Sequence, residues 1–114
     1  MKSYTDIEQS KKLAEILPVE SADMSYRPYR EEGGIPDYHA DLCPYNFASW
    51  IGVPCWSLTA LLGVIPDVSL NSFKDGGDWN VMVQHDGRMI YVDKENPVDA
   101  CVELIIKLHE QKLI

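Results

Sequence analysis

One short segment of the sequence has the residue types of a nucleophilic site. Cys55 follows Pro54, and proline suits the first turn of a helix. The positive end of a helix dipole can stabilise a cysteine thiolate, which makes the sulfur nucleophilic. Cys55 also shares one helical face with Leu58 and Leu62, as a small buried apolar side chain would. We prefer the buried thiol as the interpretation of Cys55.

The residues after Cys55 extend the enzyme-like pattern. A tryptophan follows it, residues 61–66 read Leu-Leu-Gly-Val-Ile-Pro, and Trp79 begins a hairpin that ends at Asp93. This combination resembles transglutaminase-like cysteine enzymes, and the Cys-Trp pair alone is also similar to papain-like peptidases. The resemblance implies Cys55 as nucleophile, Asp93 as orienting carboxylate, and a histidine base two residues before Trp79. This chain has Gly77 there, so the base is missing.

The expected register of the hairpin shows whether His85 could replace the missing base. Asp86-Gly87 is a two-residue hairpin loop signal, so His85 pairs with Arg88 and Asp93 pairs with Asn80. At about 3.4 Å per residue, His85 and Asp93 lie on the order of 17 Å apart, and they point to opposite faces. Two side chains so placed form no catalytic dyad.

Other candidate ligands are sparse. His39 lies in residues 30–54, the least readable part of the chain, and the sequence leaves open whether it approaches Cys55. His39 and Cys43 have i,i+4 spacing, but no second ligand pair follows them. We therefore predict no metal and no cofactor. We also predict no catalytic residues, except that Cys55 and Asp93 are the catalytic pair under the enzyme alternative.

Tyrosines and methionines provide candidates for a binding surface. Tyr26 and Tyr29 lie on a strand whose proline suggests an exposed sheet edge. Met82 and Tyr91 lie on the outer, half-polar face of the hairpin. Because tyrosine is favoured at interface hot spots, we name these four residues as the binding site. Their alternative role is to cover a small core.

Three helices should position these residues. The first spans about 5–17, and Thr5 and Glu8 form its capping box. The second spans about 55–64 and is apolar nearly all round, which predicts burial. The third spans about 97–111 and has an asparagine N-cap followed by a proline.

The remaining elements are strands, expected at 22–29, 38–42, 68–73, 79–85 and 88–93. In the hairpin 79–93, one face carries Val81, Val83, Ile90 and Val92 and should cover the core. We predict an α+β fold, in which one antiparallel sheet of about four or five strands is packed by three helices. Residues 1–114 should form a single domain.

Charge and cysteine usage restrict the partners. The net charge is −8, from 18 acidic and 10 basic residues, which disfavours nucleic acid and anionic membranes. Three cysteines without close spacing suggest reduced thiols, although a pairing of Cys43 or Cys55 stays open. The N-terminal segment is polar and no apolar stretch is long enough to span a bilayer. We expect a cytoplasmic protein.

The two ends of the chain and its central helix carry a second resemblance. Residues 5–14, 21–24, 54–58 and 96–101 resemble small uncharacterised proteins of gut anaerobic bacteria and their phages or mobile elements. The resemblance implies a phage or mobile-element context and no particular activity.

The sequence therefore favours a non-enzymatic accessory or protein-interaction domain. A protein partner is expected, and neither its identity nor the oligomeric state is indicated. One alternative is a degenerate or minimal transglutaminase-like or papain-like cysteine enzyme that uses Cys55. Another is an acidic inhibitor or nucleic-acid mimic, which presents carboxylates to a nucleic-acid-binding protein.

Overall fold

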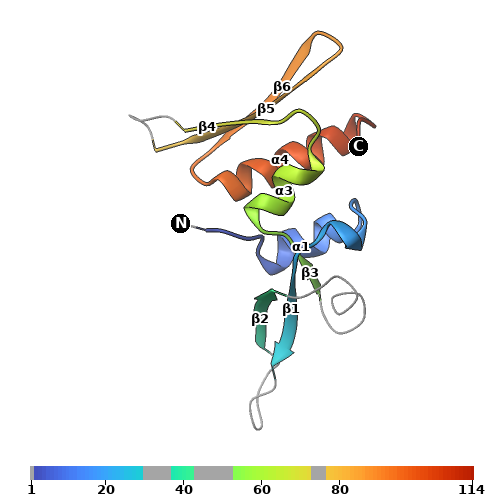
Figure 1. Cartoon of the computed structure of the whole chain (residues 1–114), viewed down its shortest axis with the longest axis vertical. Helices are drawn as coiled ribbons and strands as arrows, with labels where there is room; N and C mark the ends of the chain where they lie inside the picture. The colour runs from blue at the N-terminus through green and yellow to red at the C-terminus, as the bar shows by residue number, and fades with distance from the viewer. Residues whose placement is uncertain (1, 30–36, 43–52, 73–76) are drawn as a thin grey trace.

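The computed structural model describes residues 2–29, 37–42, 53–72 and 77–114, of which 27–29 and 37–42 are described by their backbone alone. Within these residues the fold is α+β, with three α-helices and two small antiparallel sheets (Figure 1). This confirms the predicted class. The predicted single sheet of four or five strands is not found, because the strands divide between the two sheets.

One sheet contains the predicted hairpin. Its strands are β4 (Ser69–Ser72), β5 (Trp79–His85) and β6 (Arg88–Lys94), in the order β4-β5-β6. Asp86 and Gly87 have φ values of 49° and 78°, which matches a type I′ turn. The register is the predicted one, with His85 opposite Arg88 and Asn80 opposite Asp93.

Helix α4 (Pro97–Glu110) packs against this sheet, and α3 (Leu58–Val64) packs against α4. The prediction for α4 is confirmed, since the Asn96 side chain accepts hydrogen bonds from the backbone N–H groups of Val98 and Asp99. Val81, Val83 and Val92 are buried on the helix side of the sheet. The opposite side of β4, β5 and β6 carries a mixture of polar and apolar residues.

The second sheet is built around the N-terminal part of the chain. Its strands are β1 (Met24–Tyr29), β2 (Asp37–Leu42) and β3 (Val53–Cys55), in the order β2-β1-β3. Helix α1 (Ile7–Ala14) packs against β3, and the short 3₁₀ helix η1 (Val19–Ser21) precedes β1.

Local capping fixes where α3 begins after β3. Ser57 caps α3, and Asp23 accepts hydrogen bonds from the Ser57 backbone and hydroxyl. The chain therefore enters α3 two residues after the end of β3. The predicted start of this helix at residue 55 is wrong, because Cys55 still pairs with Met24 in the sheet.

Helix α1 also differs from its prediction. Its N-cap is Asp6, which forms a reciprocal capping box with Gln9, whereas Thr5 and Glu8 were expected. Thr5 is buried, and its hydroxyl bonds elsewhere in the structure. The helix therefore begins at Ile7 and is shorter than the expected 5–17.

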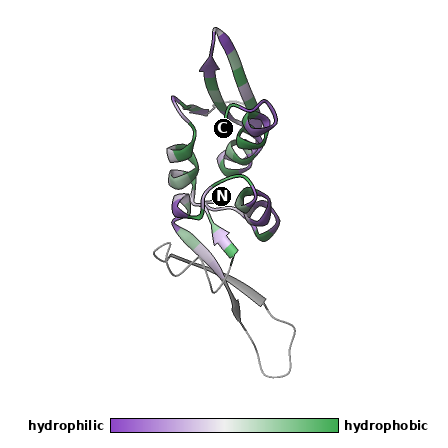
Figure 2. Ribbon diagram, turned by 90° about the vertical axis from the view of Figure 1, so that its right-hand side faces the viewer, coloured by the Kyte–Doolittle hydropathy of each residue, from purple (hydrophilic) through white to green (hydrophobic). Residues whose placement is uncertain are grey.

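Buried apolar side chains of α1, α3, α4 and the β4-β5-β6 sheet belong to one cluster. Figure 2 marks the apolar residues along the ribbon in green. The fully buried members of the cluster come from α1, from the segment after β3, and from α3, β5 and α4, as in Leu13, Trp56, Leu61, Val81 and Leu104. The core thus lies around α4, which contacts α1, α3, β5 and β6.

Candidate functional site

Cys55 occupies a different position from the one its motif suggested. It is the last residue of β3, and two residues separate it from the first helical residue, Leu58. The helix N-terminus is capped by Ser57, whose hydroxyl accepts a hydrogen bond from the Ala60 backbone N–H at 3.2 Å. The sulfur of Cys55 is fully buried.

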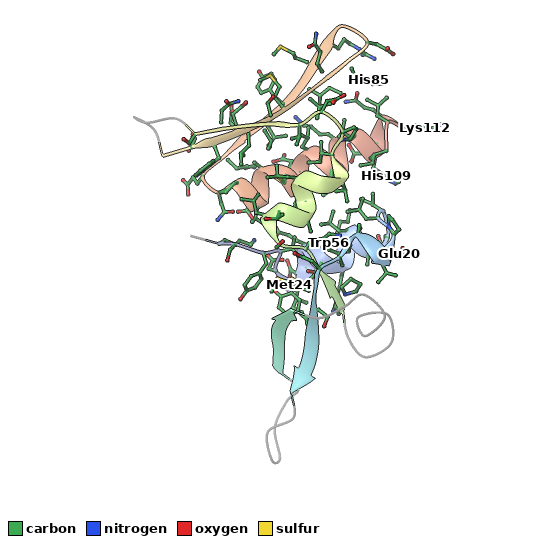
Figure 3. The ribbon with its side chains drawn as sticks, in the orientation of Figure 1. Glu20, Met24, Trp56, His85, His109 and Lys112 are labelled. Carbon is green, nitrogen blue, oxygen red and sulfur yellow. The ribbon has the colours of Figure 1, made fainter. Side chains whose placement is uncertain are left out.

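The Cys55 thiol lies within a buried polar cluster centred on Thr5. The Thr5 hydroxyl is 2.7 Å from the Ser10 hydroxyl and accepts a hydrogen bond from the Trp56 backbone N–H at 3.1 Å. The carbonyl oxygen of Thr5 accepts from the Tyr26 hydroxyl, and the Cys55 thiol lies 3.5 Å from that oxygen. Figure 3 labels Trp56 at this junction of α1, β3 and α3.

The electrostatics of this cluster keep the thiol protonated. Burial raises the pKa of Cys55 above its usual range, and hydrogen bonds with the Thr5 and Ser10 hydroxyls only partly oppose it. A nucleophilic cysteine has the opposite property, a pKa lowered toward neutrality. In this arrangement Cys55 acts as a small apolar side chain that also donates one hydrogen bond.

The other residues of the enzyme hypothesis lie elsewhere. Asp93 is exposed on β6 and accepts a hydrogen bond from the Asn80 side chain at 2.7 Å. His85 lies at the loop end of the hairpin, with its ring 3.4 Å from Asp86 (Figure 3). His39 pairs through its backbone with β1, and its side chain lies outside the described residues. The structure therefore puts Cys55 and Asp93 in different sheets.

The tyrosines of β1 differ from the expected exposed pair. Tyr26 is only 8% exposed, and its ring meets that of Tyr4 edge to face at 6.3 Å. The prediction of an exposed Tyr26 is wrong, because its hydroxyl reaches the buried Thr5 carbonyl. The side chain of Tyr29 is outside the described part of the structure.

The predicted outer face of the hairpin is an open surface, which we call the open face. It consists of the side chains of β4, β5 and β6 that point away from α4: Ser69, Asn71, Asn80, Met82, Gln84, Met89, Tyr91 and Asp93. Met89 and Tyr91 are 61% and 57% exposed. A hollow of about 480 Å³ lies across this face, between Met82 and Met89.

Met89 lies on the open face but was not among the four predicted binding residues. It lies opposite Gln84 and two residues before Tyr91, so the period-two alternation of β6 already placed it on the open face. Its exposed fraction exceeds that of Tyr91, which alternation alone does not reveal.

In the part of the chain that the structure describes, no group of three or more His, Cys, Asp or Glu side chains is arranged to hold a metal ion. The longest described helix, α4, has 14 residues, and none of these helices is both long and apolar enough to span a bilayer.

Comparison with known proteins gave no relative from which a role could be transferred. No family model matches the chain, and no curated protein or solved structure matches it either.

Proposed function

We propose that this protein is a non-enzymatic protein-interaction domain that binds a partner protein through its open face. The observation that carries the proposal is the exposure of Met89 and Tyr91 side by side on a sheet that no described helix covers on that side. Methionine and tyrosine are enriched where proteins meet, and both offer large contact areas. The polar Gln84 and Asn80 beside them are suited to the rim of such an interface.

The cellular setting remains part of the same proposal. The resemblance of residues 5–14 and 96–101 supports an accessory protein of phage or mobile-element type. Cys55 and Cys101 are free thiols, as expected in a reducing compartment, and this supports a cytoplasmic location.

The two alternatives have less support. The enzyme alternative requires an accessible thiolate, and Cys55 is buried with a raised pKa. The acidic mimic requires carboxylates that are free to imitate phosphates. Several carboxylates are instead paired with lysines, as in the Lys94–Glu103 pair at 3.0 Å.

The test uses a photocrosslinking amino acid in place of Met89, in the full chain expressed in its host. We expect it to trap one protein reproducibly, and we expect Tyr91→Asp in the same chain to abolish trapping. Ile114→Asp is the matched control, because it adds the same charge at another exposed apolar residue, outside the sheet.

Two results would contradict the proposal. One is the absence of a specific crosslink from position 89 when the same crosslinker at Glu8, on α1, traps a protein. The other is equal trapping by the Tyr91→Asp and Ile114→Asp proteins.

A further inference from the structure

The outer edge of β6 carries backbone hydrogen-bonding groups that no described strand pairs with. A two-residue loop makes His85 and Arg88 a hydrogen-bonded pair, and such pairs alternate with non-bonded ones along an antiparallel ladder. Met89, Tyr91 and Asp93 therefore turn their N–H and C=O groups away from β5. The Tyr91 carbonyl accordingly meets the Lys107 ammonium group of α4, at 3.5 Å.

A groove runs along this edge between β6 and the C-terminal half of α4. Its volume is about 590 Å³, and it is lined by Arg88, Met89, Ile90 and Tyr91 of the strand, by Lys107 and Glu110 of the helix, and by the C-cap residue Gln111. A strand edge beside a helix is the arrangement in which proteins bind an extended peptide as an additional strand. The half-buried Ile90 provides an apolar floor.

The charges around the groove favour an acidic binding partner. The chain carries a net charge of −8, yet Arg88 and Lys107 both line this groove, against the single carboxylate of Glu110. A carboxylate-bearing segment would therefore gain two cationic partners. A second copy fits less well. When β6 pairs with β6 over its whole length, Arg88 of each copy faces Lys94 of the other.

We infer that β6 binds an extended acidic segment of the partner protein as a fourth strand of the sheet. Its main chain bonds to Met89, Tyr91 and Asp93, an apolar side chain lies over Ile90, and carboxylates approach Arg88 and Lys107. The inference rests on the proposed function, because it names the part of the partner that is bound. The side chains on the other side of the added strand extend the open face.

The probe is a seven-residue peptide in which glutamate, valine, valine and glutamate alternate with threonine. It is added to the full chain labelled with ¹⁵N. We expect the amides of Met89, Tyr91 and Asp93 to become at least threefold slower in hydrogen exchange at saturation. A matched peptide with lysine in place of glutamate should bind at least tenfold more weakly.

Two variants separate edge pairing from side-chain contact. Tyr91→Pro removes an outward N–H, whereas Tyr91→Thr keeps it, so only the first should lose peptide binding. If the proline variant does not fold, the double variant Arg88→Glu, Lys107→Glu gives the second test. Its preference should reverse in favour of the lysine peptide.

The inference is overturned if both peptides bind equally, if neither binds, or if the protected amides are those of β4 and not of β6. These outcomes leave the proposed function intact as long as the crosslink from position 89 persists. Loss of that crosslink contradicts the proposed function itself.

Discussion

Thr5 is fully buried, and its polar atoms hold three parts of the chain together. Its backbone N–H donates to the Trp56 carbonyl at 3.0 Å. Its hydroxyl accepts a hydrogen bond from the Trp56 backbone N–H and forms another with the Ser10 hydroxyl. In the residues that the structure describes, no buried side-chain nitrogen or oxygen is left without a partner. Loss of this hydroxyl would remove the acceptor of the buried Trp56 backbone N–H and one partner of the Ser10 hydroxyl.

The first prediction follows from that arrangement. Thr5→Val keeps the shape of the side chain but removes the hydroxyl, so we expect the free energy of unfolding to fall by about 1–3 kcal/mol. Thr5→Ser retains the hydroxyl and should cost less than half as much. Urea unfolding followed by circular dichroism measures both, and equal losses would show that the hydrogen bonds at Thr5 are unimportant.

The second prediction concerns Cys55. In the double variant Cys43→Ser, Cys101→Ser it is the sole cysteine. Because burial raises its pKa and covers the sulfur, a thiol reagent at pH 7 should label it at least a hundredfold more slowly in the native protein than in denaturant. Labelling at the rate of a free thiol in native protein would restore the enzyme alternative.

Residue types predicted some of this chemistry and missed the rest. The separation of His85 from Asp93 followed from the predicted hairpin register, which the structure confirms. The burial of Tyr26 did not follow, because it depends on a contact with Thr5, 21 residues earlier in the chain.

At the scale of elements, Gly63 and Gly87 allow the effect of backbone conformation on stability to be separated from that of steric clashes. A Cβ atom added to Gly87 or to Gly63 would meet no atom within 4 Å, so neither substitution creates a clash. Gly87 has a positive φ of 78° in the hairpin loop, whereas Gly63 is in α3. The two positions differ in the backbone conformation that a substituted residue must adopt.

The third prediction is that alanine has opposite effects at these positions. Gly87→Ala should destabilise the protein by about 1–2 kcal/mol, since alanine is strained at positive φ. Gly63→Ala should stabilise it by up to about 1 kcal/mol, through its higher helix propensity. Thermal unfolding of the two variants decides the matter, and shifts of the same sign would contradict the assigned conformations.

Elements with local signals were predicted best. The hairpin and α4 carry their own turn and cap residues, and both were found where expected. The beginnings of α1 and α3 were misplaced, because Thr5 and Cys55 are held by strand-like contacts to distant residues. No local sequence pattern indicates such contacts.

At the scale of the whole molecule, one ion-pair network ties the N-terminus to the last helix. Lys2 lies 2.8 Å from Asp99 of α4 and 3.1 Å from Asp6, and Gln9 also donates to Asp99. Burial alone would raise the pKa of Asp99, but the hydrogen bonds from Lys2 and Gln9 outweigh it and hold this pKa below its usual range. The charged carboxylate is thus favoured by folding.

The fourth prediction is a dependence of stability on pH. A carboxyl with a depressed folded-state pKa stabilises the protein above its unfolded pKa of about 3.9, and this contribution disappears as the pH falls below that value. Asp99→Asn should therefore reduce the free energy of unfolding by up to about 1 kcal/mol at pH 7, and by less at pH 3. Urea unfolding at both pH values measures this.

A matched control distinguishes the ion pair from net charge. Glu110→Gln removes a negative charge from the end of the same helix and should change stability little at either pH. A deficit for Asp99→Asn that is equally large at pH 3 would contradict the role of its charge.

The division of the strands into two sheets could not be predicted. Alternation shows which face of a strand is apolar, but it does not say which strand is its neighbour. The three-residue β3 had no recognisable pattern, and its pairing with β1 joins residues about thirty positions apart.

The backbone contacts of Ser3 and Thr5 can form only after a much later part of the chain has been synthesised. The backbone of these residues bonds to Trp56 and Leu58, which leave the ribosome more than fifty residues later. At roughly 5–20 residues per second, the N-terminal segment waits about 3–10 s for these partners, and longer for Asp99. Ser3 and Thr5 therefore reach their native positions only after Trp56 and Leu58 have been made.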